Sequence, residues 1–326
     1  MGKRSPTVKL SVVTTLYQSA PFVGEFYRRA KSTLERMGLE YEFIFVNDGS
    51  PDPSLGLALD LMEHDPAIRV VDLSRNFGHH RAALSGLSYA TGDLVFMTDC
   101  DLEEDPGLIE TFYQEWAKRD GIVDVVYGTQ AVRQGPWLRR LTGEIFYRLM
   151  NLVAGENIPR NLTMTRLMSR RFVDNLLRYE ERTFYIDGLF QSTGFEQLTI
   201  PIDKHYKGVS TYTLRRRWSL ALDGMLSQGS RLLIGVFLIG LLLSLSSFAY
   251  IVVLVYNRLI AAAPVDGWTS LMVSVWFLGG TIISSVGIVG LYVGKIFLET
   301  KKRPLVVVRK VYENNGRRPN ADSRGR

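Results

Sequence analysis

The sequence has few of the features that mark a secreted protein. Its 326 residues include one cysteine, so no disulfide can form within the chain, which fits a reducing compartment. The start, Met1–Pro6, has no apolar core like that of a signal peptide and leads directly into a strand-like pattern. We therefore expect the N-terminal part to stay in the cytoplasm. No internal repeat is found, and only the polar tail Glu313–Arg326 has the composition of a disordered segment.

Charged residues are missing from two long stretches near the C-terminal end, Leu232–Asn257 and Gly267–Gly294. Each exceeds the roughly 20 residues that cross the hydrocarbon core of a bilayer. We therefore predict two transmembrane helices, at 232–257 and 269–296, joined by a short external loop at 258–268. The alternative is a pair of buried core helices in a soluble protein, and core helices are usually shorter than these uncharged runs.

Basic residues precede the first stretch and follow the second. They are Arg215, Arg216, Arg217 and Arg231 on one side and Lys295, Lys301, Lys302 and Arg303 on the other. The positive-inside rule then places both termini in the cytoplasm and makes the chain an integral protein of the inner (plasma) membrane. The net charge of +6 is concentrated beside apolar segments, which favours attraction to a bilayer surface over binding to nucleic acid.

The first 211 residues have the pattern of a separate cytoplasmic domain. Strand-like and helical segments alternate in the order Val8–Leu16, Phe22–Met37, Tyr41–Val46, Leu55–His64 and Ile68–Leu73. This βαβαβ order predicts an α/β, Rossmann-like fold with a mostly parallel sheet. In such sheets, ligands bind in a crevice at the carboxyl ends of the strands.

An acidic segment follows the next predicted strand, Leu94–Met97. Asp99, Asp101 and Glu103 occupy alternate positions directly after it, at the predicted crevice. Carboxylate oxygens are hard ligands that suit Mg²⁺ or Mn²⁺, so we predict a site for one of these cations. The alternative is an acidic loop before the N-terminus of a helix, where negative side chains are favoured without any metal.

The loop after the third strand is basic. Arg75 and Arg81 flank an Asn-Phe-Gly turn there and are candidates to face a diphosphate, although a solvated basic turn is an open alternative. His79 and His80 are adjacent, which suits neither a metal site nor a catalytic triad. We therefore assign them to the lining of the pocket at most.

Three motifs together resemble a known family. They are Asn47-Asp48-Gly49-Ser50, then Leu73-Ser74-Arg75-Asn76-Phe77-Gly78-His79, then Asp99-Cys100-Asp101-Leu102-Glu103. In this order they are similar to the polyisoprenyl-phosphate hexose synthases among the family-2 glycosyltransferases. The resemblance implies a GT-A fold, a nucleotide-sugar donor and a polyprenyl phosphate acceptor. It also implies that Asp48 contacts the nucleobase, Asp99 the ribose side and Asp101 the metal on the diphosphate, with Glu103 where the family usually has Gln and Arg75 near the nucleotide.

Two positions depart from the family pattern. The opening Pro-x-Tyr-Asn-Glu motif is replaced by Thr15-Leu16-Tyr17-Gln18-Ser19, so only Tyr17 is carried over as a nucleotide-binding residue. Met164 stands where many relatives have Asp before Arg166-Leu167, and Arg166 is carried over as a catalytic residue. A lipid phosphate monoester has a second pKa of about 6 and is largely ionised near neutral pH. An attacking phosphate oxygen therefore needs little help from a general base.

Three further segments are predicted to face the membrane or the acceptor. Trp137–Ala154 has apolar residues at helical spacing and predicts an interfacial amphipathic helix at about 136–154, unless that helix packs on the domain's own core. By the resemblance, Arg133 and Arg140 lie near the acceptor phosphate. Lys204–Tyr212 is similar to the family's Gly-x-Ser-x-Tyr segment, which would bring Lys207 and Ser210 to the diphosphate; a basic juxtamembrane linker is the alternative.

The C-terminal part completes the predicted organisation. A second amphipathic helix at 212–231 is expected to enter the first span. The cytoplasmic segment 297–326 contains a β-prone run, Leu305–Val311, of a kind that pairs with a neighbouring subunit in relatives, so a homo-oligomer is suggested.

The predicted function is inverting, metal-dependent transfer of a sugar, with UDP-glucose favoured as donor, to polyprenyl (undecaprenyl) phosphate at the cytoplasmic membrane face. The product would be a lipid-linked sugar donor for glycan or lipopolysaccharide modification. One alternative is a polysaccharide synthase, although Leu214 replaces the Gln of that class's Gln-x-x-Arg-Trp motif. The other is a non-catalytic membrane scaffold that binds nucleotide-sugars.

Overall fold

The computed structural model describes residues 8–119, 122–130, 162–182, 186–202 and 267–314, together with isolated helical positions between 233 and 256. Several predictions lie outside these residues. They are the helices at 136–154 and 212–231, most of the first span and of the external loop, and the site residues Arg133, Arg140, Lys207 and Ser210.

One mixed sheet forms the centre of the domain. Its strands are β1 (Lys9–Leu16), β2 (Glu40–Asn47), β3 (Ile68–Leu73), β4 (Leu94–Met97), β5 (Val125–Gln130), β6 (Leu162–Ser169), β7 (Gln197–Ile202) and β8 (Val308–Glu313). Their order across the sheet is β7-β5-β6-β4-β1-β2-β3-β8. Strands β3, β2, β1 and β4 are parallel neighbours, which confirms the Rossmann-like core predicted from the alternating pattern.

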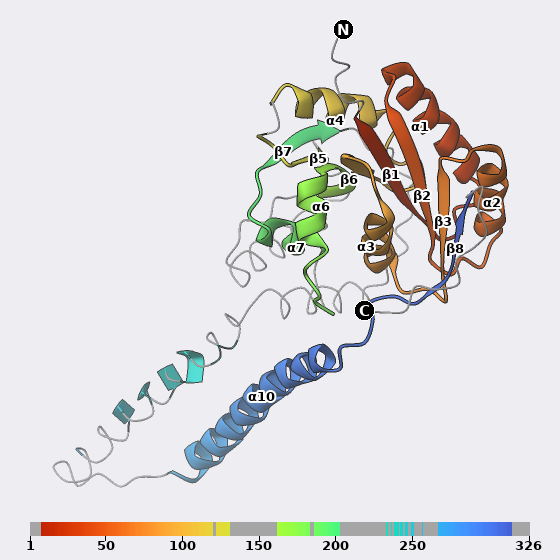
Figure 1. Cartoon of the computed structure of the whole chain (residues 1–326). Helices are drawn as coiled ribbons and strands as arrows, with labels where there is room; N and C mark the ends of the chain where they lie inside the picture. The colour runs from red at the N-terminus through yellow and green to blue at the C-terminus, as the bar shows by residue number, and fades with distance from the viewer. Residues whose placement is uncertain are drawn as a thin grey trace.

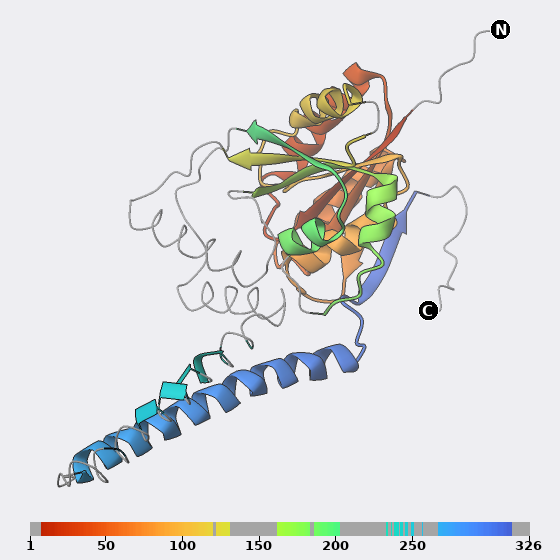
Figure 2. The ribbon, with the colours of Figure 1, turned by 90° about the vertical axis from the view of Figure 1, so that its left-hand side faces the viewer.

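Helices cover both faces of this sheet (Figure 1), and Figure 2 shows the two helical layers from the side. One layer contains α1 (Val23–Met37), α2 (Ser54–His64) and α4 (Leu108–Ala117); the other contains α3 (His79–Tyr89), α6 (Arg170–Leu176) and α7 (Ile186–Ser192). Alternation along each strand explains the two layers, since Phe43 and Phe45 of β2 pack in the first core and Ile44 and Val46 in the second.

Strand β6 was not predicted from the sequence. It runs antiparallel to β4, with Met97 opposite Arg166, and so extends the sheet beyond its parallel core. The helix after it begins with Ser169 as its cap, because the Ser169 hydroxyl accepts a hydrogen bond from the backbone N–H of Phe172.

The C-terminal strand β8 pairs antiparallel with β3 of the same chain, and Val71 lies opposite Val311. The predicted β-prone run at 305–311 therefore overlaps a strand, which begins three residues later and ends two residues later. In this structure it pairs with the edge of the chain's own sheet, where β3 would otherwise leave backbone groups unpaired. A homo-oligomer stays a prediction.

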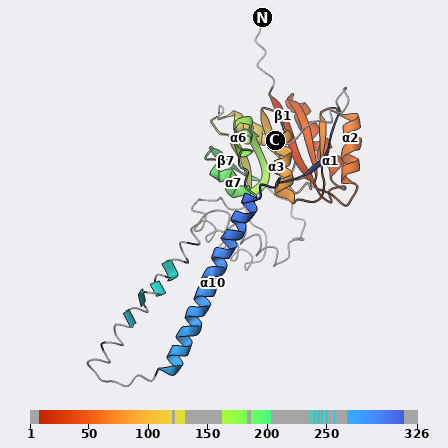
Figure 3. The same ribbon diagram turned by 60° about the horizontal axis from the view of Figure 1, so that its bottom comes forward.

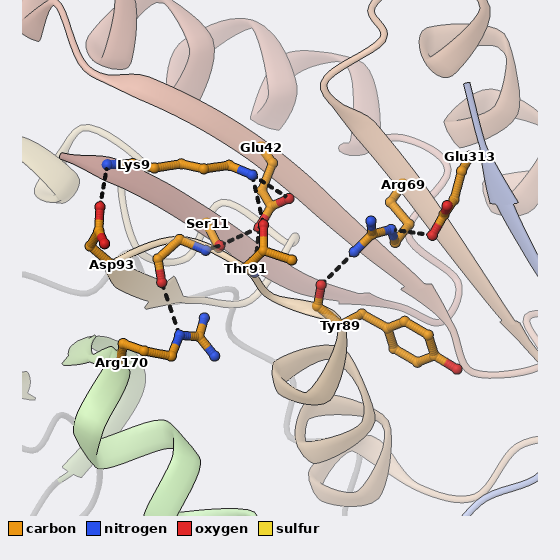
Figure 4. A network of polar contacts seen from close by, with 10 residues as sticks. Lys9, Ser11, Glu42, Arg69, Tyr89, Thr91, Asp93, Arg170 and Glu313 are labelled. Carbon is orange, nitrogen blue, oxygen red and sulfur yellow. Dashed lines mark hydrogen bonds and ion pairs between the residues drawn. The ribbon is translucent and has the colours of Figure 1, made fainter. Parts of the chain in front are cut away.

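A polar network joins the amino ends of the strands, opposite the predicted crevice (Figure 4). The Glu42 carboxylate accepts hydrogen bonds from Ser11 Oγ (2.6 Å), the Thr91 backbone N–H (2.6 Å) and Lys9 Nζ (3.1 Å). Burial opposes ionisation of Glu42, but these donors outweigh it and keep its pKa below the usual value. Because these groups bond to one another, we assign this end of the sheet a structural role.

The apolar helix α10 (Trp268–Thr300) extends away from the domain (Figure 3). It covers the predicted second span, and its segment Phe277–Thr300 is long and apolar enough to cross a membrane. It is the only helix of that length and apolar composition among the described residues. The isolated described positions between 233 and 256, in the predicted first span, are helical as well.

Candidate active site

The predicted site residues meet at one edge of the sheet. Because β1 to β4 are parallel, their carboxyl ends lie side by side, with β1 and β4 at the centre. Helix α1, which follows β1, and helix α3, which precedes β4, lie on opposite faces of the sheet. This reversal is the switch point at which open α/β sheets bind their ligands. Tyr17, Asp48, Arg75, Asp99 and Asp101 all follow these strand ends.

Asp48 is almost fully buried and holds the neighbouring loop. One oxygen of its carboxylate accepts a hydrogen bond from the Phe77 backbone N–H (2.7 Å) and the other from that of Gly78 (3.0 Å). Burial raises the pKa of this carboxyl above its usual value, although the two N–H donors act in the opposite direction. Asp48 thus holds the loop after β3 in place through two hydrogen bonds. Its contact with a nucleobase stays a prediction.

Gly49 lets the loops after β2 and β3 touch. Its φ of +59° lies in the left-handed region, and a Cβ there would come within 2.5 Å of the Arg75 carbonyl carbon and the Asn76 nitrogen. No other residue fits this approach. The predicted nucleotide residue Arg75 is exposed, and its guanidinium lies 4.3 Å from the centre of the Phe77 ring.

The altered opening motif forms its own hydrogen bonds. The Tyr17 and Gln18 backbone N–H groups donate to Ser19 Oγ (3.1 Å) and Ser50 Oγ (2.7 Å). Gln18 has a φ of +54°, so the chain turns sharply after β1. The Tyr17 side chain is 48% exposed beside the crevice. Ser19, which replaces an acidic residue of the family, therefore shapes this turn.

His79 lies between the two central strands. Its Nδ1 is 2.9 Å from Thr15 Oγ1, near the carboxyl end of β1, and its Nε2 is 3.2 Å from Asp99 Oδ1 after β4. A tautomer with the proton on Nε2 accepts the Thr15 hydroxyl at Nδ1. The approach of Nε2 to Asp99 is close, but its geometry is not that of a hydrogen bond. The sequence placed His79 only in the lining of the pocket, and the structure makes it the first residue of α3.

Asp101 and Glu103 form a tight turn after β4. The Glu103 backbone N–H donates to Asp101 Oδ1 (3.0 Å), and Leu102 between them has a φ of +59°. Among the described residues, no group of three or more His, Cys, Asp or Glu side chains is close enough to hold a metal ion. The predicted set of three carboxylates is therefore not assembled here. Mg²⁺ typically uses one or two carboxylates together with substrate phosphates, so the hard oxygens of Asp99 and Asp101 still fit this donor type.

Glu104 has a role that the sequence did not reveal. It is buried, and its carboxylate accepts a hydrogen bond from the Thr165 hydroxyl of β6, which also bonds Thr98 (2.6 Å). The carboxylate next to the predicted metal ligands thus connects the acidic loop to β6. A run of acidic residues gives no indication of which one turns inward.

Arg166, predicted as a catalytic residue, is fully buried at 1% exposure. Its guanidinium forms an ion pair with Asp187 of α7 and lies 4.0 Å from the centre of the Phe190 ring. This environment is that of a structural ion pair, and a catalytic role for Arg166 stays a prediction. Met164 is half-buried and packs against the same core.

The burial of His80 leads us to predict that the stability of the domain depends on pH. Burial, assisted by the charges of His79 and Arg166 and opposed by that of Asp187, lowers the pKa of His80 from 6.5 to about 4. As the pH falls from about 6.5 to 4, the unfolded chain binds a proton that the folded chain excludes, so stability falls. We expect the melting temperature of His80→Gln to fall less than that of the wild type over this range. The exposed His64→Gln is the control and should behave like the wild type; equal pH profiles for His80→Gln and the wild type would contradict the assignment.

The fold and the site together define an α/β domain of the nucleotide-binding type, with carboxylates at its switch point. The sequence profile of "Glycosyl transferase family 2" matches residues 11–177, and the chain belongs to this family. It is therefore a glycosyltransferase, as predicted from its motifs.

Individual relatives cover nearly the whole chain. A Mycobacterium tuberculosis (strain CDC 1551 / Oshkosh) protein named "Putative glycosyltransferases" is 43% identical over 94% of this chain and 89% of its own length. The "SfII prophage-derived bactoprenol glucosyl transferase" of Shigella flexneri is 30% identical over 94% of this chain and 100% of its own length. Among solved structures, mannosyl-3-phosphoglycerate synthase from Rubrobacter xylanophilus aligns with a TM-score of 0.47 at 17% identity, covering 70% of this chain and 74% of that one.

Proposed function

We propose that this glycosyltransferase transfers a sugar, with inversion, from a nucleotide-sugar to polyprenyl (undecaprenyl) phosphate at the cytoplasmic face of the membrane. UDP-glucose is the favoured donor. The acceptor proposal is supported by the full-length relative named a bactoprenol glucosyl transferase. The predicted topology of two spans with both termini in the cytoplasm is part of this proposal.

The observation that carries the proposal is the closeness of the crevice edge to the apolar helix. The Ser74 backbone N–H, directly after β3, donates to the Val307 carbonyl (2.8 Å). Val307 is seven residues beyond Thr300, the end of α10, so at most about 25 Å of chain separates them. Glu299 in the last turn of α10 also accepts a hydrogen bond from the Arg182 backbone N–H (2.8 Å). A lipid phosphate at the membrane surface would meet the strand ends rather than the opposite side of the domain.

The proposed chemistry follows from this placement. An oxygen of the polyprenyl phosphate attacks C1 of the sugar, and the nucleoside diphosphate leaves. Asp99 and Asp101 would hold Mg²⁺ or Mn²⁺, with Glu103 beside them. A cation bound there neutralises charge on the leaving diphosphate. Because the lipid phosphate is already ionised near neutral pH, the reaction proceeds without a carboxylate at Met164.

The remaining proposed roles concern binding and orientation. Tyr17, Asp48 and Arg75 would contact the nucleotide, whereas Lys207 and Ser210 would approach the diphosphate. Arg133 and Arg140 would hold the acceptor phosphate by charge-assisted hydrogen bonds. Holding both reactants in line at the membrane surface removes much of the entropic cost of their encounter.

The test is transfer of labelled sugar from UDP- and GDP-sugars to undecaprenyl phosphate by the purified full-length chain, with Mg²⁺ or Mn²⁺ present. We expect one donor, UDP-glucose first, to yield a chloroform-extractable product that mild acid cleaves. Reactions without the lipid are the control. Nucleotide-sugar binding without product from any donor would contradict the proposal and favour the scaffold alternative.

A further inference from the structure

Strand β8 lies beyond the residues that the family profile matches, yet it reaches the crevice. It runs along β3, with Val70 opposite Tyr312 near one end and Leu73 opposite Val308 at the other. Just past this last pair, the Ser74 backbone N–H donates to the Val307 carbonyl. The first residue of the loop after β3 is therefore hydrogen-bonded to the C-terminal segment.

Arg309 provides a second hydrogen bond to the same residue. Its Nη2 donates to the Ser74 carbonyl (2.7 Å), and its Nη1 lies 3.4 Å from Asp72 Oδ2. Ser74 is thus held by both of its backbone groups. The Arg309 side chain is 60% exposed and Asp72 only 2%. The shorter bond, to the Ser74 carbonyl, lies at the surface, and the longer contact with Asp72 is partly buried, so Arg309 acts through both.

The contacts continue to the loop after β2. Asp72 Oδ1 accepts a hydrogen bond from Asn47 Nδ2 (2.7 Å), and Asn47 Oδ1 accepts one from the Ser50 backbone N–H (3.2 Å). Asn47 and Asp72 are buried, so this part of the chain of contacts is shielded from solvent. It connects Arg309 to the loops that carry two of the proposed nucleotide residues, Asp48 and Arg75.

The opposite end of β8 is anchored separately. Glu313 forms an ion pair with Arg69 (2.7 Å), and Arg69 donates to the Tyr89 carbonyl (2.5 Å), as Figure 4 shows. Removing the Arg309 guanidinium should therefore loosen the crevice end of β3 without releasing the whole strand.

We propose that Arg309 is a positioning residue for the nucleotide moiety of the donor, acting through Ser74 and through Asp72 and Asn47. The segment that follows the membrane helix thereby completes the nucleotide site of the cytoplasmic domain. This inference rests on the proposed nucleotide-sugar specificity of that site, and it is independent of the identity of the acceptor.

The experiment compares Arg309→Gln with Lys310→Gln in the full-length protein in detergent. Lys310 is the next residue, exposed, with its ammonium 4.3 Å from the centre of the Tyr312 ring, so its replacement removes the same charge without touching Ser74. We measure the Kd of UDP and GDP by calorimetry, the KM of donor and acceptor, and hydrogen exchange at residues 74–77.

For Arg309→Gln we expect the nucleotide Kd and the donor KM to rise about tenfold, because a charge-assisted hydrogen bond is lost. The kcat and the acceptor KM should change less than about twofold, and exchange should accelerate at Ser74 and Phe77. Arg309→Lys, which keeps the charge, should lie between Arg309→Gln and the wild type. Lys310→Gln should match the wild type in every measurement.

Three results would overturn the proposal: unchanged exchange at residues 74–77 in Arg309→Gln, an equal loss of nucleotide affinity in Lys310→Gln, or faster exchange throughout the sheet with a lower melting temperature. The last would make Arg309 a residue of general stability. Nucleotide binding and exchange are measured without acceptor, so failure of lipid transfer would count against the proposed function alone.

Discussion

Asp101→Asn should reduce sugar transfer by about three orders of magnitude while the domain stays folded. The substitution keeps the size of the side chain and its ability to accept the Glu103 N–H, but it removes the negative charge expected to hold the cation. Loss of electrostatic stabilisation of a leaving group typically lowers rates by about 10²–10³. The measurements are the transfer rate, the melting temperature and the affinity for Mn²⁺ determined by electron paramagnetic resonance.

Asp105→Asn is the matched control. Asp105 lies four residues further along, is exposed, and its Oδ1 accepts the Gly107 N–H (3.0 Å) in the same kind of turn. Asp105 lies further from the end of β4 than the predicted metal ligands, so its replacement should leave the transfer rate within about twofold of that of the wild type. Full activity of Asp101→Asn, or unchanged Mn²⁺ affinity, would remove Asp101 from the proposed metal site.

The second large effect concerns stability. Asp187→Ala should destabilise the domain by about 3–5 kcal/mol, because it leaves the Arg166 guanidinium buried without its counter-charge. The check is the free energy of unfolding or, where unfolding is irreversible, the melting temperature. Asp174→Ala is the control, since its pair with Arg170 (3.4 Å) is at the surface and should contribute less than about 1 kcal/mol.

A double substitution separates structure from catalysis at this pair. Arg166→Met with Asp187→Leu removes both charges and should recover much of the stability lost in Asp187→Ala. If the recovered protein transfers sugar, Arg166 acts in folding only; if it is stable and inactive, the predicted catalytic role is supported. Equal stabilities of Asp187→Ala and Asp174→Ala would contradict the burial argument itself.

The parallel core was predictable because its signals are local. Strands such as Ile68–Leu73 are short apolar runs, and α1 has apolar residues at helical spacing, so composition within ten or fifteen residues indicates each element. Strand β6 was missed for the converse reason. Its residues Leu162–Ser169 mix polar and apolar side chains without a clear period, and pairing with β4 and β5 makes them a strand.

The candidate site shows the same division. Asp99 and Asp101 were predicted to lie at the crevice because they directly follow a buried strand, and strand ends of a parallel sheet meet. The inward turn of Glu104 toward Thr165 was not predictable, since that contact joins residues 61 positions apart. The same holds for His79, whose contacts with Thr15 and Asp99 span 64 and 20 positions of sequence.

The sequence by itself determined the α/β core, the carboxylates after β4, the family and the apolar C-terminal segment. Periodicity, strand ends and motifs can each be recognised within a short segment of the sequence. Only the tertiary structure decided that Arg166 is buried against Asp187, that Asp48 clamps the neighbouring loop, and that β8 returns to β3 and contacts Ser74 through Arg309. Those contacts depend on which distant surfaces pack together, and the free energy that selects them comes from burial and pairing across the whole domain rather than from local preference.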